Sequence, residues 1–187
     1  MNRNHCPEVI PVLESKRIIL RPWEEQDASA LYQYAKDPKV GPIAGWNPHK
    51  DEEDSLNIIR TVLSAPETYA VVLKETGEPV GSVGLANLET DTPEAGYWIG
   101  VPYWGQGLIP EAVELLLERC FIELGKTGVW CGYYDHNHKS RRVQEKCGFT
   151  YHHTERDKLC AITGDIHDEH FSYLSRQDWE KRRSPAT

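Results

Sequence analysis

Hydrophobic residues recur along the chain with two different periods, one typical of strands and one typical of helices. Strands are expected over 17–20, 69–74, 80–88, 94–101, 129–134, 150–158 and 165–174. Helices are expected over 27–36, 51–63, 112–124 and 139–146. Gly164 lies between the last two strands and predicts that they form a hairpin. This order predicts an α/β (α+β) domain with a largely antiparallel sheet.

The turn between the strand at 94–101 and the helix at 112–124 has the most specific pattern in the chain. Residues 102–110 read Pro-Tyr-Trp-Gly-Gln-Gly-Leu-Ile-Pro, so Gly105 and Gly107 come just before a helix. Glycine allows a positive φ and a close approach of the backbone to a ligand. The first turn of a helix has unpaired N–H groups and a positive dipole end. The turn therefore predicts an anion site, most often one for phosphate.

Other phosphate-binding turns fit this chain poorly. A Walker loop needs a glycine five positions ahead of Gly-Lys-Thr, but Cys120 stands there and the triplet at Gly125 follows a helix. A dinucleotide fingerprint needs a third glycine where Pro110 stands. A tight turn without a ligand is the alternative for Gly105 and Gly107 taken alone.

Four ordered blocks extend the pattern beyond this turn. They are Arg17-Ile-Ile-Leu-Arg-Pro-Trp, the segment from Gly77 to Leu85, Glu94-Ala-Gly-Tyr-Trp-Ile with the Trp104–Ala112 turn, and Asn137-x-x-Ser140 through Phe149. Together they resemble the GNAT acetyltransferases, most closely the branch that includes the ribosomal-protein N-terminal acetyltransferases. The resemblance covers residues 12–180 and implies a GNAT-like fold. In this fold a twisted, mostly antiparallel sheet is flanked by helices and splays open between the strands at 94–101 and 129–134, with the coenzyme in the split.

The resemblance implies acetyl-CoA as the acetyl donor and a primary amine as the acceptor. The pantetheine arm would pair with the strand end, and the pyrophosphate would lie on backbone N–H groups of the glycine turn. The implied coenzyme-binding residues are Ile99, Gly100, Val101, Trp104, Gly105, Gln106, Gly107, Leu108, Ile109, Asn137 and Ser140. The family commonly has Gly or Ala where Ile109 stands, so this side chain must point away from the phosphates.

Glu94 is the candidate general base. It precedes Gly96-Tyr97-Trp98 on the coenzyme strand, where some related enzymes use a glutamate, acting through water. A carboxylate beside a primary ammonium can remove a proton from it at neutral pH. The alternative is a solvated strand-end acid that pairs with a neighbouring Lys or Arg.

Ser140 is the candidate acid toward the leaving thiolate, because the resemblance places the serine of Asn-x-x-Ser there. Other members of the family use a tyrosine seven residues after the asparagine, but Gln144 occupies that position here. The alternative for Ser140 is an N-cap of the helix at 141–146. Asn137 is expected to hold the pantetheine amide or the strand end.

Two adjacent tyrosines near the end of the strand at 129–134 are further candidate site residues. Tyr133 and Tyr134 alternate across their strand, so one is expected to face the core and the other to reach the cleft, and the sequence does not decide which.

No His-Glu-x-x-His helix and no Cys-x-x-Cys pair is present, so no metal site is expected.

The composition of the chain limits the kinds of partner that the protein is expected to bind. A formal net charge of −8 argues against nucleic acid and is compatible with a cationic amine. No apolar run has membrane-spanning length, and the first residues lack the apolar core of a signal peptide. The 5 cysteines are scattered, which is typical of free thiols in a reducing cytoplasm. We therefore expect a single cytoplasmic domain over 12–180, with flexible ends at 1–11 and 181–187 and no membrane partner.

The expected function is direct acetyl transfer from acetyl-CoA to a primary amine in a ternary complex. The acceptor is either a protein N-terminal α-amine or a small amine such as an amino acid, a polyamine or an aminoglycoside. The segment 46–48 and the hairpin tip at 158–168 are expected to line its site, and a homodimer is compatible with the sequence. The alternative is a non-catalytic acyl-CoA-binding module that acts as a sensor or scaffold.

Overall fold

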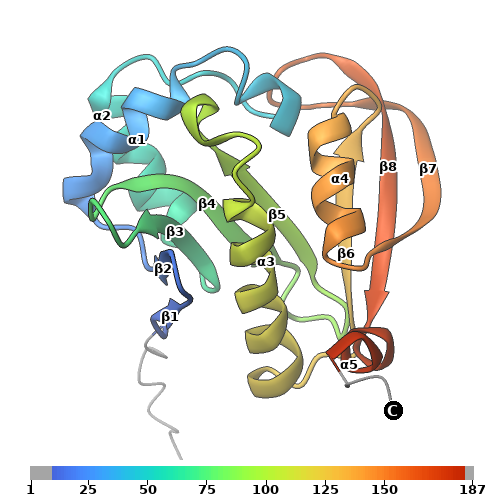
Figure 1. Cartoon of the computed structure of the whole chain (residues 1–187). Coiled ribbons are helices and arrows are strands. Elements are labelled where there is room, and N and C mark those ends of the chain that lie inside the picture. The colour runs from blue at the N-terminus through green and yellow to red at the C-terminus, as the bar shows by residue number, and fades with distance from the viewer. Residues whose placement is uncertain (1–9, 184–187) are drawn as a thin grey trace, which may run out of the picture.

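The computed structural model describes residues 10–183 and contains one eight-stranded sheet with helices on both faces (Figure 1). The strands are β1 (Leu13–Glu14), β2 (Ile18–Arg21), β3 (Thr68–Leu73), β4 (Pro79–Ala86), β5 (Glu94–Ile99), β6 (Gly128–Tyr134), β7 (Thr150–Leu159) and β8 (Ile166–Ser175). The helices are α1 (Ala28–Ala35), α2 (Glu52–Ile58), α3 (Leu108–Glu118), α4 (His138–Lys146) and α5 (Arg176–Arg183). The α/β (α+β) order that the sequence predicts is confirmed.

The strand order is β1-β2-β3-β4-β5-β6-β8-β7, and β5 with β6 is the parallel pair in an otherwise antiparallel sheet. This pair is short, because it is registered only at Glu94 with Trp130 and at Ala95 with Cys131. By contrast, β5 pairs with β4 from Glu94 to Ile99, and β6 pairs with β8 from Gly128 to Tyr134. The two middle strands therefore diverge, which confirms the expected splay of the sheet.

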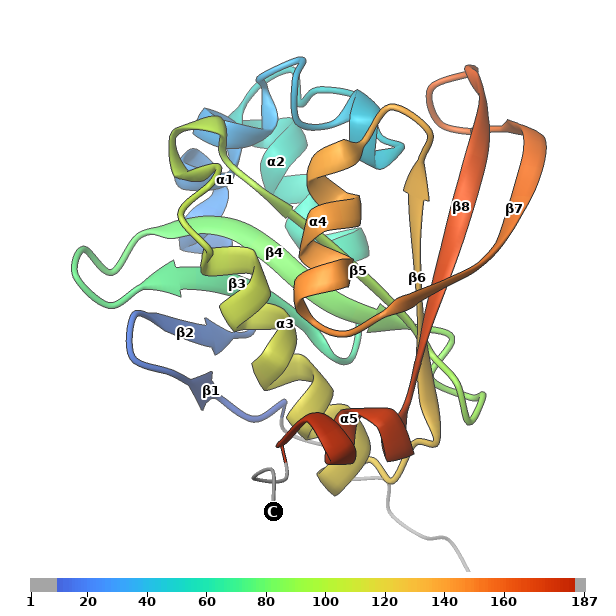
Figure 2. The same cartoon turned by 45° about the vertical axis from the view of Figure 1, so that its right-hand side comes forward.

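Helices α3 and α4 lie on one face of the sheet, and α1 with α2 lies on the other (Figures 1 and 2). On the first face, Leu116, Leu117 and Phe121 are fully buried in the larger hydrophobic cluster. On the second face, Leu31 of α1 packs in a smaller cluster with Ala70 of β3. Side chains on both faces of the sheet are thus buried, so its strands are rich in apolar residues.

Several boundaries differ from those expected. β5 ends at Ile99 instead of residue 101, because Val101–Tyr103 forms a 3-10 turn that contains Pro102. α3 begins at Leu108 instead of residue 112, and Pro110 fits in its first turn because the N–H it lacks would be unpaired there. Both α2 and α3 continue as π-helical turns, over Ile59–Leu63 and Arg119–Glu123.

Both ends of the described chain belong to the fold. The sequence pattern gave no sign of α5, which is mostly charged, buries Trp179 and runs to Arg183, beyond the expected domain end at 180. At the other end, Ile10 packs against the core and Leu13–Glu14 forms β1. The rest of the ends that the sequence suggested to be flexible, 1–9 and 184–187, lies outside the described residues. Within residues 10–183, no helix is long and apolar enough to cross a membrane.

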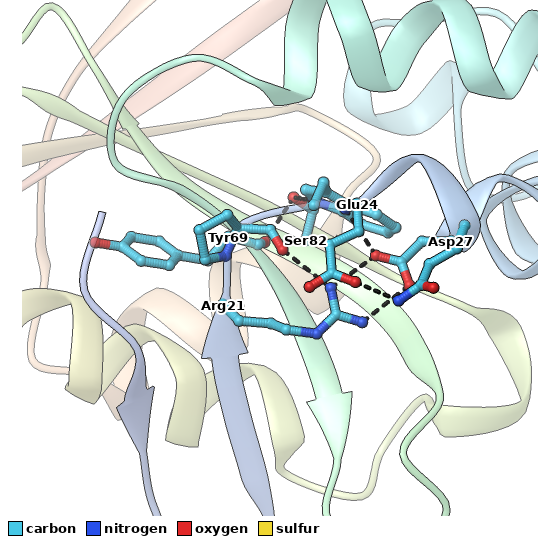
Figure 3. A network of polar contacts seen from close by, with 8 residues as sticks. Arg21, Glu24, Asp27, Tyr69 and Ser82 are labelled. Atoms are coloured by element: carbon cyan, nitrogen blue, oxygen red, sulfur yellow. Dashed lines mark hydrogen bonds and ion pairs between the residues drawn. The ribbon is translucent and has the colours of Figure 1, made fainter. Parts of the chain in front are cut away.

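An ion pair secures the entry to α1. The guanidinium of Arg21 donates to both carboxylate oxygens of Asp27, at 2.7 and 2.9 Å, and the backbone N–H of Glu24 donates to the same carboxylate (Figure 3). Nearby, the indole N–H of Trp23 donates to Ser82, whose hydroxyl donates to the Tyr69 carbonyl. These bonds join the β2–α1 connection to the middle of the sheet.

We expect Asp27→Ala to lower the free energy of unfolding by about 2–4 kcal/mol, because it leaves a largely buried guanidinium without its partner. Glu25→Ala is the matched control, since Glu25 and Arg60 form a similar pair with side chains 62% and 54% exposed. Exposed pairs contribute little, so this control should unfold almost as the parent does. Urea melts of the three proteins measure the difference, and equal losses in both variants would contradict it.

Candidate active site

The glycine turn has the backbone shape that the sequence predicts. Gly105 and Gly107 both have φ of 76°, and Gly107 is the N-cap of α3. The turn is held in place by Trp104, whose indole N–H donates to the Ile99 carbonyl at 3.0 Å, and by Arg17, which donates to the Gln106 carbonyl at 2.9 Å. The first N–H groups of α3 thus lie at a fixed turn, free of intrahelical partners and available to an anion.

A cleft of about 380 Å³ runs between this turn, the end of β5 and α4. It brings together most of the expected coenzyme-binding residues, namely Ile99, Trp104, Gly105, Gly107, Leu108, Ile109, Asn137 and Ser140. Gly100, Val101 and Gln106 are not among its lining residues, and the Gly100 N–H donates to the Val80 carbonyl. The Ile109 side chain is 5% exposed and packs in the core, so it points away from the turn as required.

Three basic residues of α4 also line this cleft, and sequence reasoning missed them. They are Lys139, Arg142 and Lys146, which recur at helical spacing on one face. The Lys139 ammonium lies 3.8 Å from the centre of the Trp104 ring and so covers the turn. Their positive charge adds to that of the α3 N-terminus, and together they suit a ligand with several phosphate groups.

The start of α4 assigns different roles to Asn137 and Ser140 than expected. Asn137 is the N-cap, since its side-chain oxygen accepts from the Ser140 N–H at 3.1 Å. The alternative role of Ser140 as the N-cap is therefore wrong, because the helix begins at His138. The Ser140 hydroxyl instead lies 2.9 Å from the Tyr97 hydroxyl, and the Gln144 amide lies 3.4 Å from it.

Tyr97 is a second site residue that sequence reasoning missed. Burial raises the pKa of its hydroxyl well above the usual range, so the group stays protonated. Its single proton has two acceptors on Ser140, the hydroxyl at 2.9 Å and the backbone carbonyl at 3.1 Å. When Tyr97 donates to the hydroxyl, the proton of Ser140 is free to point into the cleft. In that arrangement Tyr97 and the Gln144 amide both donate to the Ser140 oxygen, which directs the Ser140 proton toward the cleft.

Glu94 lies on the opposite face of the sheet from this cleft. Successive residues of a strand alternate between faces, so Glu94, Gly96 and Trp98 share the face of α1 and α2. A Cβ added at Gly96 would meet nothing within 4 Å, so there is open space beside Glu94. Trp98 also lines the coenzyme cleft, and its ring packs edge-on against that of Trp46, with the two ring centres 5.6 Å apart.

The surroundings of Glu94 bear on both of its expected roles. Burial raises the pKa of its carboxyl, and the nearby Glu169 raises it further. Within residues 10–183, Glu94 forms no ion pair; Lys158 instead pairs with Glu155 and Glu169. The alternative of an acid paired with Lys or Arg is therefore not supported. An unpaired carboxyl with a raised pKa has the properties of a general base.

Neither tyrosine at the end of β6 lines the coenzyme cleft, so the expectation that one of them reaches it is wrong. Tyr134 stacks on His167 with ring centres 4.5 Å apart, and Tyr133 packs on His170 at 5.0 Å. Their positions follow from strand alternation, because Tyr134 shares the face of Gly132 and Tyr133 the face of α4. No group of three or more potential metal ligands occurs within the described part of the chain.

The hairpin tip and the segment at 46–48 lie together, as the expected acceptor site requires. The Asn47 amide donates to the Ile162 carbonyl at 2.9 Å, and the Cys160 thiol donates to the Gly45 carbonyl at 3.3 Å. These contacts close one end of the face that carries Glu94 and Trp98.

Comparison with known proteins identifies the family to which this chain belongs. The family model described as Acetyltransferase (GNAT) domain matches residues 17–150, and the chain belongs to this family. It is 28% identical to the N-acetyltransferase p20 of Bacillus licheniformis, over 88% of this chain and 97% of that protein. It is 34% identical to the protein YdaF of Bacillus subtilis, which bears a ribosomal N-acetyltransferase name, over 56% of this chain and 57% of that one.

A solved structure supports the same fold. The ribosomal-protein-S5-alanine acetyltransferase of Vibrio fischeri superimposes with a TM-score of 0.73 at 20% identity, over 90% of this chain and 98% of that one. The chain is thus an acetyltransferase of the GNAT family, as its sequence motifs suggest.

We expect Glu94→Gln to raise the melting temperature at pH 8, because a raised pKa means that the ionised carboxylate destabilises the folded state. The folded protein binds more protons than the unfolded chain between the two pKa values, so the stability of the parent falls as pH rises through that window. The advantage of the variant should shrink once the pH falls below the ordinary glutamate pKa of 4.5. Melts from pH 4 to 8 measure it, with the exposed Glu89→Gln as control; a pH-independent difference would contradict the burial argument.

Proposed function

We propose that this protein is an acetyl-CoA-dependent N-acetyltransferase that moves the acetyl group directly to a primary amine. The observation that supports this most strongly is the split between β5 and β6. On one face of the split lies a cleft with the glycine turn, and on the other lies open space between Glu94 and Trp98. A donor and an acceptor entering from opposite faces would meet at the end of β5.

The residues of the cleft fit acetyl-CoA. The N–H groups of Leu108 and Ile109, in the first turn of α3, would receive the pyrophosphate, with the basic side chains of α4 beside them. The Gly100 N–H points to β4, so by strand alternation the Ile99 N–H points into the split. This N–H is our candidate donor to the thioester oxygen, which gains negative charge during transfer.

Acetyl-CoA supplies the thioester, and the chain supplies the proton transfers. Glu94 is the first residue of β5, five residues before Ile99, so it accepts the proton of the acceptor ammonium through water and leaves a neutral amine. The amine nitrogen forms a bond to the acetyl carbon as the carbon–sulfur bond breaks, and the nitrogen then loses its second proton to water. Ser140 faces the cleft and gives its proton to the leaving thiolate while Tyr97 donates a hydrogen bond to its oxygen, and Ser140 regains a proton from water.

A protein N-terminal α-amine is the acceptor that we favour, because YdaF and the Vibrio fischeri enzyme carry names that refer to ribosomal acetylation. A small amine is the second candidate. The non-catalytic sensor would need neither Glu94 nor Ser140, and the unpaired Glu94 argues against it. A reducing cytoplasm belongs to this proposal, since Cys120, Cys131, Cys147 and Cys160 are all free.

The test is release of free thiol when the protein is incubated with acetyl-CoA and a panel of amines. The panel comprises a peptide beginning with Ala, one beginning with Ser, an amino acid, a polyamine and an aminoglycoside. We expect release with one class above the rate without acceptor. Binding of acetyl-CoA without release on any member would favour the sensor.

We expect Gly105→Glu to abolish the thermal stabilisation by acetyl-CoA, since it places bulk and negative charge beside the phosphates. Gly77→Glu is a matched control, because Gly77 has φ of 73° against 76° at Gly105 and both have open space around them. Ligands that bind the folded state raise its melting temperature. An undiminished shift in the Gly105 variant would show that the phosphates lie elsewhere.

We expect Ser140→Ala to slow single-turnover acetylation of the acceptor found in the panel, with little change in acetyl-CoA affinity, which is typical of an interaction made only in the transition state. Loss of a general acid costs about 10²–10⁴-fold. Tyr97→Phe removes only the proton that orients Ser140, so its loss should be smaller. Full single-turnover rates in both variants would mean that the thiolate leaves without help from this pair.

A further inference from the structure

Two carboxylates reach the same point over β6 although they come from different strands. A Cβ placed on Gly132 would lie 2.8 Å from Glu169 Oε1 and 3.5 Å from Glu94 Oε1. Glu94 belongs to β5 on one side of β6, and Glu169 belongs to β8 on the other. Any side chain at Gly132 would therefore enter the space between the two carboxylates.

The charged groups nearest Glu94 lie on β7 and β8. Glu169 is the nearest charged neighbour from β8, and Lys158 and Glu155 come from β7. Tyr134 of β6 is uncharged at neutral pH, because burial raises the pKa of its hydroxyl to about 12. The Lys158 ammonium lies 3.2 Å from Glu169 and 2.5 Å from Glu155, so its charge is shared between two carboxylates. Lys158 therefore only partly offsets the rise that Glu169 causes in the pKa of Glu94.

We propose that Glu169 is a positioning residue for the acetyl transfer, which acts through Glu94 by keeping a second negative charge beside it. This inference rests on the proposed function, in which Glu94 accepts the proton of the acceptor ammonium. The added negative charge makes Glu94 a stronger base without touching the acceptor itself. The proton passes from the ammonium nitrogen through water to a Glu94 oxygen, and Glu169 stays paired with Lys158.

Glycine at position 132 leaves room for the Glu169 carboxylate in this arrangement. The position pairs with Phe171 and lies in the middle of β6, where glycine lowers strand stability and supplies no packing. A Cβ there would also come within 3.3 Å of the Phe171 ring, so a larger residue would displace the Glu169 carboxylate. The absence of a side chain is explained if the two carboxylates must approach each other across β6.

A ¹³C NMR titration of the glutamate side-chain carboxyls tests the proposal without any acceptor, with Glu94→Gln used to assign the Glu94 signal. We expect Glu169→Gln to lower the pKa of Glu94, because it removes the negative charge that raises this pKa. Glu155→Gln is the matched control and should lower it less, since Glu155 has the smallest influence among the charged neighbours. Glu169→Asp, which keeps the charge, should retain most of the raised pKa.

The same variants give a kinetic measurement with the acceptor found in the panel. We expect Glu169→Gln to move the acid limb of the kcat/KM profile to lower pH and to reduce kcat by about two- to tenfold above it, as a weaker base does. An unchanged Glu94 titration in Glu169→Gln would overturn the role of Glu169 alone. An unchanged pH–rate profile in Glu94→Gln would instead remove Glu94 as the base, and the proposed mechanism with it.

Discussion

The site depends on one constraint, the separation of β5 from β6 after two residue pairs. The end of β5 is held by β4, because the Gly100 N–H donates to the Val80 carbonyl at 2.8 Å. A Cβ at Gly81 would lie 2.4 Å from the Trp98 carbonyl, so this close approach requires glycine. β6 follows β8 instead, and the two strands are pulled apart by their other neighbours. Backbone groups that a closed sheet would pair internally are left available to a ligand.

This opening connects two chemically different faces. The cleft beside α3 and α4 is cationic and rich in unpaired N–H groups, while the face with Glu94 and Trp98 is acidic and aromatic. Keeping a carboxylate half-buried without an ion pair lowers the stability of the folded state. Such costs are typical of sites selected for activity, where stability is reduced to keep a group reactive.

The sequence predicts local features of this protein well and long-range ones poorly. The glycine turn and the alternating strands follow from motif and periodicity, because each is determined by nearby residues. The splay of the sheet came from the family resemblance. Tyr97 was missed because its contact with Ser140 spans 43 positions and leaves no periodic signal. Glu169 lies 75 positions from Glu94, and α5 has too few apolar residues to show a buried stripe. The capping role of Asn137 instead of Ser140 depended on a helix boundary that propensity does not fix.

The central claim is that donor and acceptor enter from opposite faces and meet in the split. The most direct measurement is a crystal structure with a bisubstrate conjugate, in which the sulfur of CoA is joined through an acetyl bridge to the α-amine of a short peptide. Our account predicts the pyrophosphate on the turn at Gly105, the bridge beside Ile99 and Ser140, and the peptide on the face of the sheet that carries Glu94 and Gly96. A conjugate whose peptide lies on the same face as α3 and α4, away from Glu94, would contradict it.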